Sequence, residues 1–279
     1  MWLWLAILSG FIFTAVGLVT RHVLRQKKDA WAFSFYYSAI GALTALPFFI
    51  LHPKVADDQG PWMIMLLVGL LIVVQNFLNF KSSNILSASI QGSIMKFRLI
   101  WVFLIGLLFL QESFTFLKLG GTLLTVLAGI VILAKFKKTD SMKGVGLAFS
   151  STIAYAIVIG LYKLLFSSFN SQSLTFFIFL IPAVLNLIIM PDRFHRIIRI
   201  AKENGRGVLL ACVLGGFGNL VMNTALSIGE ASKVLVIIEA FLILTLVGEH
   251  IVLKERDHLP IKIIAVLMAT VGAICIRLS

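Results

Sequence analysis

The sequence predicts an all-α integral membrane protein with ten transmembrane helices, arranged as two inverted five-helix repeats. The first observation is composition, since 59% of the 279 residues are hydrophobic and only 13% are charged, against roughly a quarter in soluble domains. The second is that apolar segments of about 20 residues, the length that crosses a bilayer, recur along the chain. The third is a duplication, because residues 85–133 align without a gap to residues 228–276.

Ten apolar segments can be assigned as spans from their length and from the residues that break them. The predicted spans are 2–21, 31–51, 61–80, 84–110, 114–135, 144–166, 173–191, 206–227, 230–253 and 259–277. Pro53 and Pro61 flank the second loop, Pro191 closes the seventh span, and Pro260 opens the tenth. The first repeat is expected at 1–140 and the second at 141–279.

The duplication fixes which residues occupy equivalent places in the two halves. At a constant offset, Glu112 aligns with Glu255, Gly129 with Gly272, Ser89 with Ser232, Asn76 with Asn219, and Lys96 with Glu239. Each repeat has five spans, and because five is odd the second repeat enters the membrane upside down relative to the first. Inverted repeats of this kind are common in carriers.

The net charge of +12 does not indicate nucleic-acid binding, because the basic residues are confined to a few loops. Seventeen of the 24 Lys and Arg residues follow the first, third, fifth, seventh and ninth spans, whereas five lie on the opposite side. Basic loops face the cytoplasm, so this bias predicts that both termini lie outside the cytoplasm. Residues 192–206 form an amphipathic segment expected at the anionic leaflet. The protein is expected as a multi-pass protein of the cytoplasmic (inner or plasma) membrane.

Three charged residues interrupt apolar spans. Lys96 and Arg98 lie near the centre of the fourth span, where each costs about 2.5–3.5 kcal/mol on insertion scales. Glu239 lies within the ninth span at the position equivalent to Lys96, so we expect the two to pair. Arg98 aligns with Phe241 and has no matching acid, which leaves one positive charge. The three groups either brace the two halves or bind a polar solute.

Other polar and aromatic side chains of the spans are candidates for the same site. Asn76 and Asn79 share one face of the third span, and Asn219 and Asn223 share one face of the eighth. These amides could bond to one another across helices or line a solute path. Weaker candidates are Gln91 and the aromatic residues Tyr36, Tyr37, Trp101 and Tyr155, of which the aromatic side chains could stack on a solute or simply pack.

Motifs for catalysis or metal binding are not recognisable. The five histidines are scattered without metal-ligand spacing, and no soluble segment is long enough for an ATPase domain. Cys212 and Cys275 lie in apolar runs. We expect neither enzymatic activity nor a cofactor or metal. Glu112 and Glu255 close the fourth and ninth spans, and we expect each to bond the N-terminal amides of the helix that follows it.

The run from Leu107 to Ile130, with Gln-Glu-Ser before an apolar helix containing Leu-Gly and Ala-Gly steps, resembles the end of an EamA-type repeat. The run from Leu253 to Gly272 resembles the same pattern. The whole chain therefore resembles the drug/metabolite transporter superfamily. The resemblance implies a ten-helix carrier with a central cavity lined by helices 1, 3, 4, 6, 8 and 9, working by alternating access. Relatives usually keep both termini in the cytoplasm and lack the charges in the fourth and ninth spans.

The sequence thus predicts a secondary transporter of a small polar metabolite, amino-acid-like and anionic or zwitterionic. The alternatives are an exporter of cationic drug-like compounds or polyamines, and a non-transporting or lipid-modifying membrane protein. The expected partners are the solute and the lipid bilayer, with no nucleic acid and a monomeric or homodimeric state. The predicted substrate-binding residues are Lys96, Arg98, Glu239, Asn76, Asn79, Asn219, Asn223, Gln91, Trp101 and Tyr155.

Overall fold

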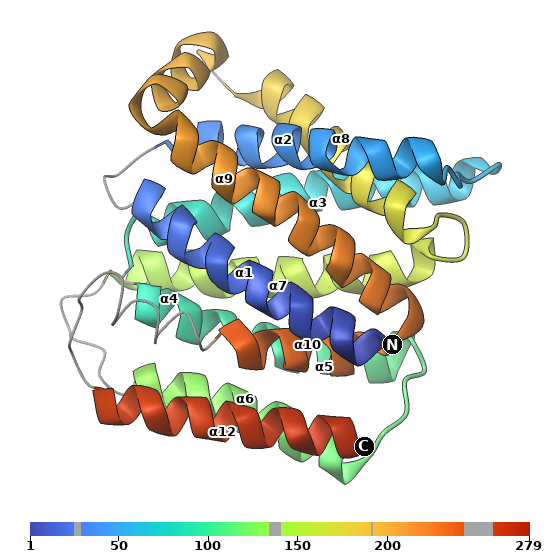
Figure 1. Cartoon of the computed structure of the whole chain (residues 1–279), viewed down its shortest axis with the longest axis vertical. Coiled ribbons are helices and arrows are strands. Elements are labelled where there is room, and N and C mark those ends of the chain that lie inside the picture. Colours follow the sequence, from blue (N-terminus) through green and yellow to red (C-terminus); the bar gives the residue numbers. More distant parts are fainter. Residues whose placement is uncertain (25–28, 87, 134–140, 191, 243–258) are drawn as a thin grey trace.

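The computed structural model describes residues 1–24, 29–86, 88–133, 141–190, 192–242 and 259–279, and every regular element in them is a helix. The helices are α1 (Trp2–Leu24), α2 (Ala30–Leu51), α3 (Gln59–Ser83), α4 (Ala88–Met95), α5 (Arg98–Phe109), α6 (Phe116–Leu133), α7 (Met142–Leu165), α8 (Ser171–Ile189), α9 (Arg193–Ile228), α10 (Ala231–Leu242) and α12 (Leu259–Leu278). They run along a common direction, and both termini lie at the same end of the bundle (Figure 1).

Seven segments of the described chain are long and apolar enough to cross a membrane. They correspond to the predicted first, second, third, fourth, sixth, seventh and eighth spans. The fifth and tenth predicted spans contain shorter apolar helices, within α6 and α12. The ninth is described only as α10, and residues 243–258 lie outside the described part of the chain. The multi-pass helical class is confirmed, whereas the count of ten spans stays a prediction.

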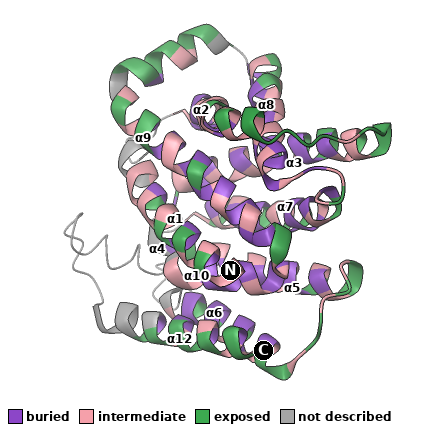
Figure 2. Cartoon of the chain, turned by 45° about the vertical axis from the view of Figure 1, so that its right-hand side comes forward, coloured by how far each residue is buried: buried purple, intermediate pink, exposed green. Residues whose placement is uncertain are grey.

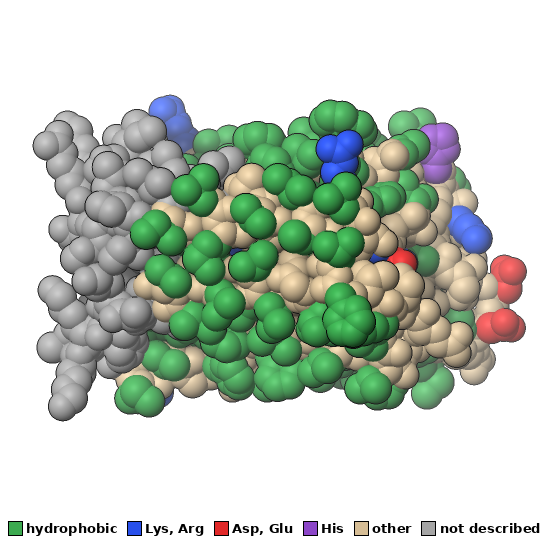
Figure 3. All heavy atoms as spheres, turned by 90° about the horizontal axis from the view of Figure 1, so that it is seen from below, with side chains coloured by type: hydrophobic (Ala, Val, Ile, Leu, Met, Phe, Trp, Pro, Cys, Tyr) green, Lys and Arg blue, Asp and Glu red, His purple; other side chains and the backbone are tan. Residues whose placement is uncertain are grey.

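The outer surface of the bundle carries large apolar side chains, as expected of a surface solvated by lipid. Leu108, Phe109 and Leu267 are 72%, 74% and 60% exposed. Apolar side chains are spread over the described part of the face on the α6 and α12 side (Figure 3), and the buried residues lie on the inner sides of the helices (Figure 2). Burial in lipid removes the cost that such exposure would have in water.

The helix pairing repeats between the two halves. α1 packs against α9 and α10, and α7, the equivalent of α1 in the second half, packs against α3 and α5. α2 pairs with α8, and α6 with α12, so equivalent helices also meet directly. The α6–α12 pair is close because a Cβ on Gly121 would lie 2.6 Å from the Gly272 carbonyl oxygen. This exchange is the arrangement expected of an inverted repeat.

The fourth and eighth predicted spans differ from the helices of the structure in their bounds. The fourth, 84–110, is not one helix but two, because α4 ends at Met95 and α5 begins at Arg98. At the break, the Lys96 and Phe97 N–H groups bond to carbonyls three residues back. The eighth span, 206–227, is longer than predicted, because the amphipathic segment after Pro191 is continuous with it in the 36-residue helix α9.

Candidate functional site

Lys96, Arg98 and Glu239 form one buried ionic cluster between the two halves. Lys96 lies at the break between α4 and α5, Arg98 begins α5, and Glu239 lies in α10. Lys96 Nζ is 2.6 Å from Glu239 Oε2, and an Arg98 terminal nitrogen contacts the other carboxylate oxygen. The predicted Lys96–Glu239 pair is present. The expectation that Arg98 has no acid is wrong, because a glutamate has two oxygens and Glu239 uses one for each cation.

The break in the fourth span positions Lys96 for this contact. Lys96 Nζ donates a second hydrogen bond to the Glu239 backbone carbonyl. Gly129 of α6 makes room on the other side, since a Cβ there would lie 2.9 Å from Lys96 Cγ and 3.0 Å from the Ser93 carbonyl oxygen. Broken helices with charged groups near the middle of the membrane are a common construction of solute and ion sites in carriers.

The Arg98 side chain lies against Tyr155 of α7, with its Cζ atom 4.4 Å from the ring centroid. The Tyr155 hydroxyl in turn donates a weak bond to Met222 Sδ of α9, at 3.7 Å. Trp101 lies one turn along α5 from Arg98, and its ring packs edge-on against Phe149. Arg98 Nε and Trp101 Nε1 are buried and have no hydrogen-bond partner among the described residues. Buried donors without a partner are uncommon in folded proteins.

The asparagines predicted as a second cluster do not come together. Asn79 Oδ1 accepts a 2.9 Å bond from Gln91 Nε2, which joins α3 to α4. Asn76, on the same helix, is 7% exposed, and its side chain makes no hydrogen bond within the described chain. The bond from Gln91 supports a bracing role for Asn79, whereas the Asn76 amide keeps unused bonding capacity within the described chain.

The two asparagines of α9 bond to other helices. Asn219 Nδ2 donates to the Tyr37 hydroxyl at 3.2 Å, and Asn223 Nδ2 donates to Thr175 Oγ1 at 2.9 Å. Asn223 Oδ1 is buried without a partner in the described chain. Tyr37 belongs to α2 and Thr175 to α8, so these amides link α9 to two helices rather than to α3.

A second ionic cluster, which sequence reasoning missed, joins the halves at the end where the termini lie. Lys118 is fully buried, and its Nζ lies 3.1 Å from Glu112 Oε2 and 2.6 Å from Glu230 Oε2. It also donates to the Ser113 carbonyl at 3.0 Å. Because Glu112 and Lys118 belong to the first half and Glu230 to the second, this cluster (the end cluster below) spans the interface.

The expected role of Glu112 is wrong in its target. Its Oε1 accepts a 2.6 Å bond from the Ala231 N–H and its Oε2 is bonded by the Ser232 hydroxyl, so it caps α10 rather than the following helix α6. Gln111, with a φ of 53°, turns the chain there, and the Glu112 N–H bonds back to the Gly106 carbonyl. Its equivalent, Glu255, lies outside the described residues.

Burial raises the pKa of the Glu230 carboxyl, but hydrogen bonds and charge from Lys118, the Ser113 hydroxyl and Lys233 outweigh that effect and hold the pKa below its usual 4.5. At the opposite end, Asp29 caps α2 through the N–H groups of Trp31 and Ala32 and receives Arg196 through two nitrogens. Burial again acts to raise the pKa of Asp29, and the Arg196 bonds lower it overall below 3.8.

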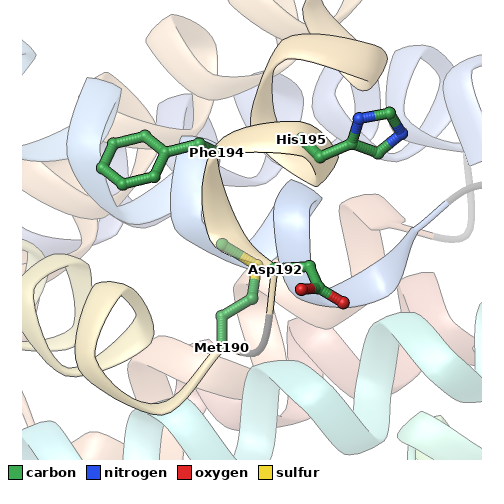
Figure 4. A pocket seen from close by; sticks show the side chains of 4 residues that line it. All are labelled: Met190, Asp192, Phe194 and His195. Atoms are coloured by element: carbon green, nitrogen blue, oxygen red, sulfur yellow. The ribbon is translucent and has the colours of Figure 1, made fainter.

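A cavity of about 530 Å³ opens at the end of the bundle where α8 meets α9, away from both ionic clusters. It is lined by Met190, Asp192, Phe194 and His195. Asp192 and His195 point to one side and Phe194 away from them (Figure 4). Within the described chain, no group of three or more His, Cys, Asp or Glu residues is placed to hold a metal ion.

These features define a class: a multi-pass helical membrane protein of two equivalent halves with buried charge between them. A model of the EamA-like transporter family matches the chain twice, at 1–134 and 142–278. The chain belongs to the EamA-like transporter family and is a membrane transporter of the drug/metabolite type. A comparison with curated proteins gave no match.

The fold is also that of solved structures, of which 28 chains match. One, titled "Crystal structure of protein", is 14% identical and superimposes with a TM-score of 0.65 over 98% of each chain. At that identity the likeness shows the fold alone, so the solute and the transport cycle are matters for proposal.

Proposed function

We propose that the protein is a secondary transporter of a small anionic or zwitterionic metabolite, which binds at Lys96, Arg98 and Glu239. The observation that carries the proposal is the charge of this cluster. Two cations surround one carboxylate at side-chain exposures of 6%, 16% and 2%, which leaves one net positive charge among these three groups. Buried charge without a counter-ion is costly, so the cluster favours an anionic group on the solute.

The position of the cluster suggests how binding drives the cycle. Lys96 and Arg98 belong to the first half and Glu239 to the second, so the ion pairs hold the halves together at their interface. An anion that binds Arg98 competes with Glu239 for its positive charge and repels the Glu239 carboxylate. A ligand shifts a conformational equilibrium only by its differential affinity for the two states, and this competition provides such a difference. Alternating access would then follow from rocking of one half against the other.

The cation-export alternative is less favoured by the same geometry. Glu239 already bonds Lys96 and Arg98, so a cationic solute would have to displace one of them. The end cluster does contain two carboxylates, but both are bonded to the buried Lys118.

The test is uptake into proteoliposomes from a defined mixture of amino acids, organic acids, nucleotides and polyamines, with the vesicle contents identified by mass spectrometry. We expect an acid or amino acid to accumulate with wild type and to fall at least tenfold with Arg98→Ala. Arg196→Ala, which breaks an ion pair at the periphery, is the matched control and should transport normally. Full-rate uptake by both Arg98→Ala and Glu239→Gln would rule the proposal out.

A further inference from the structure

We infer that the group recognised in this site is a single carboxylate, held by Arg98 Nε–H and Trp101 Nε1–H. The inference rests on the proposed function and names its substrate class. It assigns Trp101 as a hydrogen-bond donor to the solute, whereas the sequence suggested only stacking or packing for this side chain.

The single carboxylate of Glu239 does not balance both cations of the cluster. Glu239 is engaged through both oxygens, and Lys96 also occupies the Glu239 backbone carbonyl. The Glu239 carboxylate and backbone carbonyl supply two of the three acceptors that the Lys96 ammonium can use. The three-residue cluster keeps one net positive charge, and within the described chain Arg98 is the cation of the cluster with a buried nitrogen that lacks a partner.

Two donors of helix α5 lack a partner. Arg98 Nε and Trp101 Nε1 are both buried and unpaired among the described residues. The two residues are three positions apart on α5, so their side chains start from neighbouring points on one helix face, about 5–6 Å apart at Cβ. The Arg98 Cζ atom lies 4.4 Å from the centroid of the Tyr155 ring, and a guanidinium presents its N–H donors in one plane, which matches a planar acceptor.

Within the described chain, the site therefore offers one net positive charge and, on α5, two buried N–H donors without a partner. A carboxylate supplies one negative charge and two acceptor oxygens, and Arg is suited to planar anions of this kind. A phosphate dianion would reverse the charge of the cluster from +1 to −1, and an amine or amide would leave the positive charge unanswered. A monocarboxylate, free or as part of an amino acid, therefore matches both the charge and the donors of the site.

Acetate and acetamide provide the simplest test, because they have nearly the same shape and differ in charge and in one acceptor. The probe is the indole N–H signal of Trp101 in an NMR spectrum of the purified full-length protein labelled with 15N. The chain has five tryptophans, and Trp101→Phe assigns the signal by its loss. We expect acetate to move this signal downfield with saturation and acetamide to leave it in place.

Affinity gives the second readout. Trp101→Phe keeps an aromatic side chain but removes the indole N–H together with its five-membered ring, so acetate binding, measured by the stabilisation it produces, should weaken about tenfold or more. Trp4→Phe is the control, since Trp4 is 73% exposed on the outer surface, and it should bind like wild type. Arg98→Lys keeps the charge but loses the Nε donor and should also weaken binding.

Three results would overturn the inference. They are an unmoved Trp101 signal at saturating acetate, an equal response to acetamide, and tighter binding of inorganic phosphate than of acetate. Failure of the inference and of the proposed function can be told apart. If Arg98-dependent uptake of a solute without a carboxylate were observed, the transport proposal would stand and the carboxylate assignment would fall.

Discussion

The two buried ionic clusters are opposite in composition. At the centre, Glu239 lies between the cations Lys96 and Arg98, whereas at the end of the bundle Lys118 lies between the acids Glu112 and Glu230. Both clusters join the first half to the second. They differ in how completely their hydrogen bonds are made.

The end cluster is complete. An ammonium group has three donors, and Lys118 Nζ has three acceptors in Glu112, Glu230 and the Ser113 carbonyl. In the central cluster, Arg98 Nε has none in the described chain. A buried network that is fully satisfied rigidifies a structure, whereas an unpaired buried polar group is costly. The bonding of the end cluster is that of a structural brace, and the central cluster keeps the unpaired donor at which we propose that the solute binds.

The largest expected effect is at Glu239. Glu239→Gln leaves two buried cations without an acid, whereas Lys96→Met leaves the neutral Arg98–Glu239 pair. We expect the first change to lower the free energy of unfolding by about 3–5 kcal/mol and the second by about 1–2 kcal/mol. Reversible unfolding in detergent, followed by circular dichroism, measures both.

The double variant Lys96→Met, Glu239→Gln is the control, because it keeps one buried cation instead of two. It should be more stable than Glu239→Gln alone, a non-additivity that reports the coupling of the pair. Equal losses for Lys96→Met and Glu239→Gln would show that net charge does not distinguish the members of the cluster.

Lys118→Met is expected to cost about 3 kcal/mol, because it leaves two carboxylates facing each other without the cation that bridges them. Glu230→Gln should cost less than about 1 kcal/mol, since the Glu230 side chain is 31% exposed and exposed pairs contribute little. Neither change should alter solute binding at Arg98. Loss of solute binding in Lys118→Met, with the fold intact, would contradict the separation of the two clusters.

The sequence predicted the central pair because both partners stand out against apolar spans and occupy equivalent positions in the repeat. It did not predict the break at Lys96, because neither Pro nor Gly occupies positions 94–98 and the usual signals of a helix end are missing. A stack of Arg98 on Tyr155 depends on the packing of α5 on α7, which no local pattern encodes.

The end cluster was missed for a different reason. Lys118 and Glu230 lie near predicted span ends. A charged residue there is ordinarily solvated, so its position does not indicate a buried ion pair. Glu112 was identified as a cap, but a carboxylate can reach any nearby helix start, and only the packing of the two halves brings Ala231 closer than the helix that follows. Residue types could thus be assigned roles, while partners across the interface required the fold.

Gly129→Ala tests the space around the central cluster. A methyl group would lie 2.9 Å from Lys96 Cγ and 3.0 Å from the Ser93 carbonyl oxygen, so Lys96 must shift. Overpacking of this kind costs about 1–3 kcal/mol, and we expect acetate binding to change as well. Gly120→Ala is the matched control, because nothing lies within 4 Å of its added methyl. Identical stability of the two variants would show that α6 and the segment around Lys96 can move apart at no measurable cost in free energy.

The smallest effect concerns pH at the opposite end, where Asp29 pairs with Arg196. The pKa of Asp29 is lowered in the folded protein, so its stabilisation is full above its ordinary value of 3.8 and is lost as the pH falls through the folded value. The Arg196 side chain is 22% exposed and Arg199 lies 3.6 Å away, so the loss should be about 1 kcal/mol or less. Arg196→Met should remove the same amount at pH 7 and flatten this part of the acid profile.

The Glu230 carboxyl, also lowered in pKa, should give a separate loss of stability below pH 4.5 that Arg196→Met leaves unchanged. If Arg196→Met also removed the Glu230 step, the Asp29 pair and the end cluster would be energetically coupled across the bundle.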